Sequence, residues 1–239
     1  MEKQIYEIEI SAEGKFIDRP NRFICEAELL NGEKVIAHVH DSGRIKELLY
    51  PRNIVSLRKA KDTSKRKTEW DLISARAEDG EDILLNSSFH RYISENILND
   101  EEISPLGKAD SVRAEVKYGH SRLDYLVEKE GQKIWIEVKG VSLSVNRHAI
   151  FPDAPSIRAC KHLETLMELK EKGDRAGVLL LIFRNSEDFS PNWETDPQFS
   201  KLFYRAQKNG VEIYPVQLKF EKGKIFYTDK KIKIVPEKI

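Results

Sequence analysis

The sequence predicts an α/β (α+β) protein of two parts, an OB-like β-barrel over residues 1–85 and a mixed-sheet α/β domain over residues 86–239. Before residue 85, short apolar runs alternate with polar residues, as expected for strands that bury one face. After it, segments with helical spacing alternate with strands, which is typical of helices packed on a sheet. The uninterrupted apolar run 176–183 predicts a central strand covered on both faces.

The first part reads as about five short strands, a number that suits an OB-type barrel. Alternation predicts strands at Tyr6–Ile10 and Phe23–Leu29, and Asn31-Gly32 is a hairpin turn. A brief helical stretch is expected at Arg44–Leu49. The remaining strands are expected over residues 35–39, 54–57, 68–78 and 82–86.

The second part is expected to run α-β-β-β-α-β-α-β. Its first helix has Ser87 or Ser88 as the expected N-cap, and its second begins near Asp153 or Ser156. Asp196-Pro197 opens the third helix. The expected strands are 111–119, 121–128, 132–143, 176–183 and 211–218, followed by a hairpin near Gly223.

Composition excludes several classes of protein. The 40 basic and 40 acidic residues cancel, so the whole chain has no bias toward nucleic acid or membranes. Cys25 and Cys160 are too few and too far apart for a disulfide framework or a zinc cluster. No apolar segment predicts a secretory leader or a membrane span. We expect a cytoplasmic protein that needs no small-molecule cofactor.

The hairpin at residues 121–143 carries charges where burial is expected. With a two-residue turn at Glu130-Gly131, the apolar pairs are Leu123–Val138, Tyr125–Ile136 and Val127–Ile134, all on one face. On the other face Asp124 then lies opposite Glu137, with Lys139 beside them. A register shifted by two residues would place Asp124 opposite Lys139 instead. Both registers gather the three charges on one side of the sheet.

Two carboxylates this close repel each other unless a proton or a cation intervenes. Asp124 and Glu137 could therefore bind Mg²⁺ or Mn²⁺, which keep water ligands for phosphate. Lys139 could position a water or stabilise charge on a phosphoryl oxygen, so all three are candidate catalytic residues. An Asp followed on the next strand by Glu-x-Lys is the PD-(D/E)xK nuclease pattern. The alternative is a solvated face laced by ion pairs.

A basic segment at residues 44–67 contains nine basic and two acidic residues. Such a segment on a small barrel suits phosphate contacts, and Trp70 just after it suits base stacking. The alternative is a solvated loop. The helix near residue 156 adds basic side chains at its start, where anions are favoured. The candidate DNA-binding residues are Arg58, Lys59, Lys61, Lys65, Arg66, Lys67 and Arg158.

Four segments together resemble the sugar fermentation stimulation protein A (SfsA) family. They are RPNRFICEAELLNGEKVIAHVHDSGRIKELLYP, KYGHSRLDYLV, IWIEVKGVSL and FPDAPSIRACKHLETLMEL. The resemblance implies a DNA-binding protein with an N-terminal OB-like barrel and a C-terminal domain similar to PD-(D/E)xK nucleases. It places the motif on Asp124, Glu137 and Lys139, and a further acidic metal ligand on either Glu95 or Glu115.

The expected function is DNA binding with little sequence preference and a regulatory role, and RNA is an alternative partner. The first alternative activity is Mg²⁺-dependent phosphodiester hydrolysis at Asp124, Glu137 and Lys139. The second is a protein-binding role in transcription or translation without nucleic-acid chemistry.

Overall fold

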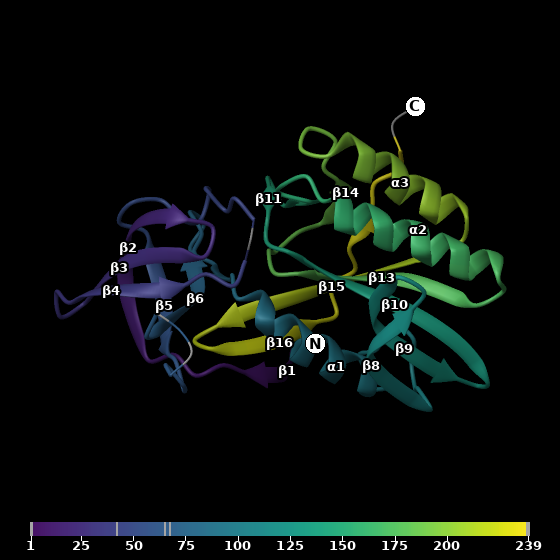
Figure 1. Ribbon diagram of the computed structural model, residues 1–239, viewed down its shortest axis with the longest axis horizontal. Coiled ribbons are helices and arrows are strands. Elements are labelled where there is room, and N and C mark those ends of the chain that lie inside the picture. Colours follow the sequence, from purple (N-terminus) through teal and green to yellow (C-terminus); the bar gives the residue numbers. More distant parts are fainter. Residues whose placement is uncertain (1, 42, 65, 67, 238–239) are drawn as a thin grey trace.

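The computed structural model describes residues 2–41, 43–64, 66 and 68–237, so that Lys65 and Lys67 lie outside the described residues. Figure 1 shows a β-barrel at one end of the molecule and an α/β domain at the other. The fold class expected from the sequence is confirmed. Among the described residues, no helix is both long and apolar enough to cross a membrane.

Five strands form the barrel, and alternate side chains of each point into it. The strands are β2 (Ala12–Asn21), β3 (Ile24–Leu29), β4 (Lys34–His38), β5 (Ile54–Lys59) and β6 (Trp70–Arg76). They pair in the order β4-β3-β2-β5-β6, and a short parallel pairing of β4 with β6 closes the ring. The expected turn at Asn31-Gly32 is confirmed, with Gly32 at φ 85°. Its left-handed conformation is one that glycine adopts without strain.

Two expectations for this part are wrong. Residues 44–49 form turns and not a helix. The first strand is β1 (Glu2–Glu7), and it pairs with β16 (Lys224–Thr228) near the other end of the chain instead of joining the barrel.

The α/β domain is built on a mixed sheet in the order β15-β13-β10-β9-β8. The strands are β8 (Ser111–Tyr118), β9 (Ser121–Lys129), β10 (Gln132–Val141), β13 (Arg175–Ile182) and β15 (Glu212–Glu221). β10, β13 and β15 are parallel to one another, whereas β9 is antiparallel to both β8 and β10. A separate small sheet, which the sequence did not predict, contains β11 (Ser144–Val145), β12 (His148–Phe151), β14 (Asp188–Pro191) and β17 (Lys233–Ile234).

Helices cover both faces of this sheet. The helix α1 (His90–Asn99), preceded by the short 3-10 helix η1 (Ser87–Phe89), packs on one face, and α2 (Ile157–Glu171) and α3 (Pro197–Lys208) pack on the other (Figure 1). The N-caps are Ser156 for α2 and Asp196 for α3, whose side chains accept backbone N–H groups of the first turn. Asn86 caps η1 by accepting the N–H of Ser88, and α1 has Phe89 at its N-cap without a side-chain cap, so the expected serine N-cap is wrong.

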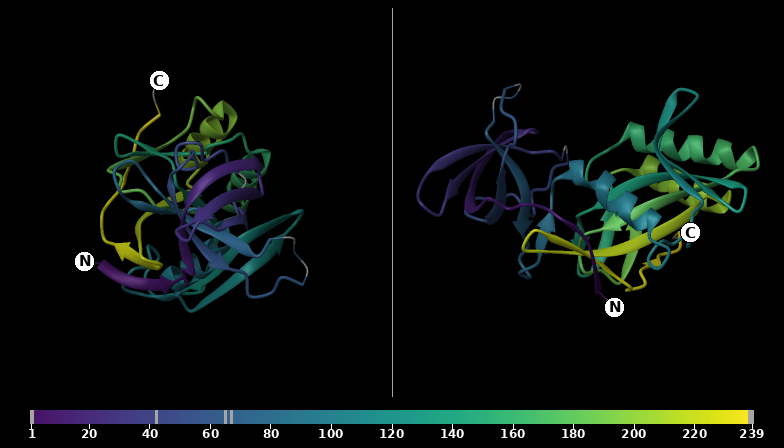
Figure 2. Two further views of the ribbon diagram at one scale, coloured as in Figure 1. Left: turned by 90° about the vertical axis from the view of Figure 1, so that its left-hand side faces the viewer. Right: turned by 90° about the horizontal axis from the view of Figure 1, so that it is seen from below.

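The two parts are joined through one hydrogen-bonded sheet. The hairpin of β15 and β16 reaches from the α/β domain toward the barrel, as Figures 1 and 2 show. There β15 pairs with β7 (Asp82–Leu84), which in turn pairs with the barrel strand β6. The domain boundary at residue 85 stays a prediction, because strands on both sides of it share this sheet.

Candidate active site and nucleic-acid interface

The charged hairpin begins as the sequence predicts and then departs from a regular ladder. Its turn is Glu130-Gly131, with φ values of 51° and 75°, and the pairs Val127–Ile134 and Tyr125–Ile136 are present. The pairing of β9 with β10 ends there. The expected pairs Leu123–Val138 and Asp124–Glu137 do not form.

β9 changes the face that it buries at Asp124. Tyr125 and Val127 belong to the core on the α1 side, whereas Leu123 belongs to the core on the α2 side. Residues two apart in a regular strand share a face, so the expectation that Leu123 joins the Tyr125 face is wrong. On the neighbouring β8 the same change occurs at Glu115, which has a φ of 53°. The Asp124 carboxylate takes over the missing ladder bond by accepting the backbone N–H of Val138 at 2.7 Å.

Glu137 is the most deeply buried acid of the hairpin, with 2% of its surface exposed. Its Oε1 accepts hydrogen bonds from Lys139 Nζ at 2.5 Å and from His162 Nδ1 on α2. Its other oxygen, Oε2, is buried without a partner among the described residues. A buried carboxylate oxygen without a donor costs free energy, which a bound cation would offset.

The two acids have pKa values shifted in opposite directions. Burial and then the negative charge of Glu137 raise the pKa of Asp124 to about 6. Burial alone would raise the pKa of Glu137, but the His162 hydrogen bond and the Lys139 charge outweigh it and lower that pKa. The pair therefore holds a proton at Asp124 more readily than an isolated aspartate does, as expected for carboxylates that share a site.

The donor set fits a hard divalent ion. Two carboxylates supply oxygen ligands, and such ions complete their coordination with backbone carbonyls and water. The part of the chain that the structure describes contains no group of three or more His, Cys, Asp or Glu side chains placed to bind a metal. Neither Glu115 nor Glu95, the two candidates for a further acidic metal ligand, joins Asp124 and Glu137. Glu115 is exposed and pairs with Arg91 and Arg122, and Glu95 lies 4.0 Å from Arg91.

His162 is a contact that the sequence analysis did not predict. Helical spacing places it on one face of α2 with Arg158, but only the structure shows that it is buried against Glu137 whereas Arg158 is exposed. The sequence indicated this contact only through a histidine among the apolar residues of an amphipathic helix, because a buried polar group needs a partner.

The basic residues of the barrel differ in whether an acidic side chain pairs with them. Arg58 and Arg66 both bind Asp71, a carboxylate that is 2% exposed, at 3.0 and 2.7 Å, and His40 is its third partner. Burial alone would raise the pKa of Asp71, but these hydrogen bonds outweigh burial and lower it strongly. Lys61 is exposed, and Lys59 lies 5.5 Å from the centre of the Trp70 ring. Trp70 itself is 6% exposed, so the expectation that it stacks on bases is wrong.

Another aromatic side chain is available on the barrel. Phe23, at the β2–β3 turn, is 55% exposed and lies parallel to His38, with ring centres 6.3 Å apart and planes 6° apart. The His38 ring meets His40 edge-on at 4.4 Å. His40 also contacts Asp71, so that the three rings connect Phe23 with the Asp71 carboxylate and its arginine partners.

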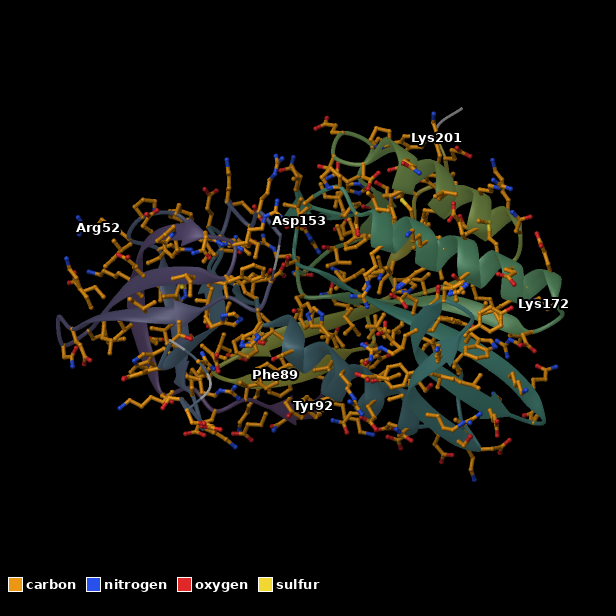
Figure 3. The ribbon with its side chains drawn as sticks, in the orientation of Figure 1. Arg52, Phe89, Tyr92, Asp153, Lys172 and Lys201 are labelled. Carbon is orange, nitrogen blue, oxygen red and sulfur yellow. The ribbon has the colours of Figure 1, made fainter. Side chains whose placement is uncertain are left out.

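A pocket of about 680 Å³ opens between the two domains, and we call it the interdomain pocket. The barrel contributes Arg19, Arg22, Arg44 and Lys46 to one wall, and residues 140–143 and 150–156 form the other. Figure 3 shows Asp153 at this junction. Gly140 and Val141, which follow Lys139 on β10, line the pocket, whereas Asp124, Glu137 and Lys139 do not.

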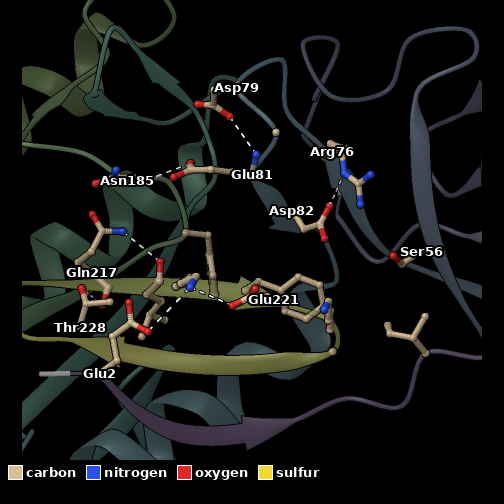
Figure 4. Close-up of a pocket in the computed structure, with 18 of the residues that line it drawn as sticks. Glu2, Ser56, Arg76, Asp79, Glu81, Asp82, Asn185, Gln217, Glu221 and Thr228 are labelled. Carbon is tan, nitrogen blue, oxygen red and sulfur yellow. Dashed lines mark hydrogen bonds and ion pairs between the residues drawn. The ribbon is translucent and has the colours of Figure 1, made fainter.

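A larger pocket of about 860 Å³ lies against the β15–β16 hairpin (Figure 4). Its charged side chains are mostly engaged with one another: Arg76 binds Asp82 at 3.0 Å, and Lys219 binds Glu221 at 2.9 Å. Acidic side chains are prominent in its lining, including Glu2, Glu13 and Asp79. This environment does not favour a phosphate chain.

Comparisons with known proteins agree over both domains. Residues 17–85 match the family model described as "SfsA N-terminal OB domain", and residues 88–224 match "Sugar fermentation stimulation protein RE domain". The sugar fermentation stimulation protein homolog of Thermosipho melanesiensis is 44% identical over 223 residues, which cover 93% of this chain and 94% of that one. The homolog of Methanosphaera stadtmanae is 41% identical over 213 residues, which cover 87% of each chain.

A solved structure is also similar throughout. It is that of Pyrococcus furiosus SfsA in complex with Ca²⁺, with a TM-score of 0.89 and 26% sequence identity. The match covers 98% of this chain and 100% of that chain.

Proposed function

Since this chain belongs to the sugar fermentation stimulation protein (SfsA) family, we propose that it binds nucleic acid and hydrolyses phosphodiester bonds with a divalent metal ion. The observation that supports cleavage most directly is the cluster of Asp124, Glu137 and Lys139 on β9 and β10, with one buried carboxylate oxygen left without a partner. The Ca²⁺ complex of the P. furiosus relative supports divalent-ion binding, because Ca²⁺ and Mg²⁺ both take carboxylate oxygens.

Each side chain of the site has its own proposed role. Asp124 and Glu137 would hold Mg²⁺ or Mn²⁺, which when bound polarises a phosphoryl oxygen and lowers the pKa of water. His162 fixes Oε1 of Glu137 and leaves Oε2 available. Lys139, 15% exposed on its side chain, can stabilise the negative charge that develops on phosphate during attack by water. These roles are the ones that the PD-(D/E)xK pattern in the sequence would assign to Asp124, Glu137 and Lys139.

Cleavage is tested with labelled single-stranded, duplex and branched DNA and with RNA, each with Mg²⁺, Mn²⁺ or EDTA. We expect metal-dependent cleavage that Lys139→Ala, Asp124→Asn and Glu137→Gln each reduce at least about a hundredfold. Lys117→Ala is the matched control, because Glu115-Val116-Lys117 repeats the Glu-x-Lys spacing on the exposed edge of β8. Cleavage that survives Lys139→Ala would exclude this site as its source.

We also propose that the barrel binds DNA with little sequence preference. The exposed cations Lys59 and Lys61 support this, and Lys65 and Lys67 remain candidates outside the described residues. Arg58 and Arg66 take part less directly, because they hold Asp71. Arg158, exposed at the start of α2, is a candidate beside the acidic site.

The test for this interface is the salt dependence of affinity. Each phosphate contact contributes about 0.9 to the slope of log K against log salt on duplex DNA, so replacing Lys59, Lys61, Lys65 and Lys67 by Ala should flatten the slope by up to about 3.6. An unchanged slope would remove this segment from the interface. Absence of both binding and cleavage, with a stable protein complex recovered from cells, would favour the protein-binding alternative.

A further inference from the structure

The interdomain pocket lies between the barrel and the end of the strand that carries Lys139. Its α/β wall begins at Gly140, next to Lys139 on β10, and continues to Ser156, the N-cap of α2. Its barrel wall contains the end of β2 and the segment that follows β4. A chain lying in the pocket would therefore touch both domains and reach the end of the strand that carries Lys139.

Contacts between the two domains fix their relative position at this pocket. Burial raises the pKa of the Asp153 carboxyl, and the nearby backbone N–H groups of Arg44 and Ile45 act against that rise. A Cβ placed on Gly43 would lie 2.0 Å from Asp153 Oδ2, so only glycine permits this approach. Arg19 donates hydrogen bonds to the carbonyl oxygens of Asp41, Gly43 and Arg44. These contacts fix the barrel wall with three structural charged groups, namely Arg19, Asp41 and Asp153.

Three cations on the same wall are free to bind a ligand. Arg22, Arg44 and Lys46 are exposed, and within the described residues their side chains have no ion-pair partner. By contrast, Arg175 of the α/β domain is paired with Glu212 at 2.8 Å. Unpaired cations that line a pocket between two domains favour a polyanion.

Phe23 indicates which polyanion fits. It does not line the pocket, but it follows Arg22 directly in the chain, and its backbone N–H donates to the Asn21 side chain at 2.9 Å. One side of the ring is covered by His38, and more than half of the residue remains exposed. Aromatic side chains stack on bases whose faces are free, as in single strands, whereas the faces of bases inside a duplex are covered by their neighbours.

We propose that the interdomain pocket holds a single-stranded segment of nucleic acid. Arg22, Arg44 and Lys46 contact its phosphates, a base stacks on Phe23, and the segment reaches the end of the strand that carries Lys139. The inference rests on the proposed function and names its substrate: single strands or single-stranded ends and flaps.

The test is equilibrium binding in EDTA, so that cleavage plays no part. A fluorescein-labelled single-stranded oligonucleotide and its duplex are titrated with full-length protein, and anisotropy is recorded at several salt concentrations. We expect the triple variant Arg22→Ala, Arg44→Ala, Lys46→Ala to flatten the single-strand salt slope by about two, at about 0.7 for each contact. The control replaces Lys15 and Lys34 by Ala, since both are exposed on the barrel and outside the pocket.

The stacking contact has its own pair of variants. Phe23→Leu keeps an apolar side chain and should weaken single-strand binding about tenfold, whereas Phe23→Tyr keeps an aromatic ring and should restore it. Duplex affinity should change little in both. Equal losses on the two substrates, or pocket variants that bind single strands like the wild type, would overturn the proposal.

The outcomes also separate this inference from the proposed cleavage. If Lys139→Ala abolishes cleavage while the pocket variants still bind and cleave single strands normally, the inference is wrong and the active site stands. If no substrate is cleaved but the pocket variants lose single-strand binding, the inference stands without the nuclease.

Discussion

The carboxylate of Asp124 occupies the position of a missing sheet hydrogen bond, 2.7 Å from the backbone nitrogen of Val138, where β9 and β10 separate. This contact holds one oxygen of Asp124 next to the strand that carries Glu137. The acids are therefore placed by an irregularity of the backbone and not by the regular ladder.

Stability should depend on the pH through Asp124. Its pKa of about 6 lies above the value of about 3.9 in an unfolded chain, so the folded state holds this proton more tightly. The free energy of unfolding should then fall as the pH rises from about 4.5 to 6, by about 2 kcal/mol. Below that window the lowered pKa of Glu137 acts in the opposite direction.

Urea unfolding in EDTA at several pH values checks this. Asp124→Asn should remove most of the fall, whereas Asp18→Asn, at an exposed position on β2, should leave it. A wild-type protein whose stability is flat over this window would contradict the assignment.

His162→Ala should weaken divalent-ion binding about tenfold to a hundredfold, because a ligand carboxylate loses the side chain that orients it. The readout is calorimetric titration of Mn²⁺ or Ca²⁺ into the protein, without substrate. Lys161→Ala, on the exposed face of the same helix, is the control. Unchanged ion affinity in His162→Ala would show that the histidine is only a packing residue.

Gly140→Ala should destabilise the protein by about 2 kcal/mol or more, since overpacking of a filled site is costly. A Cβ there would lie 2.1 Å from Cε1 of His90, whose ring stacks on Phe183 at 5.3 Å. Thermal unfolding of Gly140→Ala, His90→Ala and the double variant forms a cycle. The second change should recover part of the loss caused by the first, and strict additivity of the two losses would contradict the contact.

Asp71→Asn should cost about 3 kcal/mol or more, because it leaves Arg58 and Arg66 without their shared carboxylate. Since the pKa of Asp71 is lowered, its stabilising effect is present at neutral pH and is lost as the pH falls below about 4. Denaturant unfolding at pH 7 measures the loss, with the exposed Asp62→Asn as the control. Equal stability of the two variants would mean that the cluster contributes little.

The alternation of apolar residues predicted most strands, because burial of one face dictates it locally. The same rule predicted the faces of Ile134, Ile136 and Glu137 on β10 correctly. It did not predict the change of face at Asp124, since the pattern assumes a regular backbone and Glu115 carries no mark of its positive φ. The pairing of Glu2 with Thr228 could not be predicted from the sequence either, because periodicity identifies a strand and not its partner.

The site was predictable where chemistry demanded unusual residues. Asp124 and Glu137 were recognised because charges in an apolar hairpin need compensation. Asp71 obeys the same rule inside the strand WDLISAR, and the structure shows that Arg58 and Arg66 are its partners. Counting positive charges alone could not separate these two arginines from the free lysines around them.

The sheet that passes from β6 through β7 to β15, together with the return of β1 onto β16, ties both halves of the molecule into one ladder. Cutting the chain near residue 85 would remove β7 from the edge of β15 and β1 from the edge of β16, and the exposed backbone donors and acceptors would favour edge-to-edge aggregation. This shared sheet fixes the width of the interdomain pocket. Under the proposed function, that width would limit which nucleic-acid strands enter the pocket.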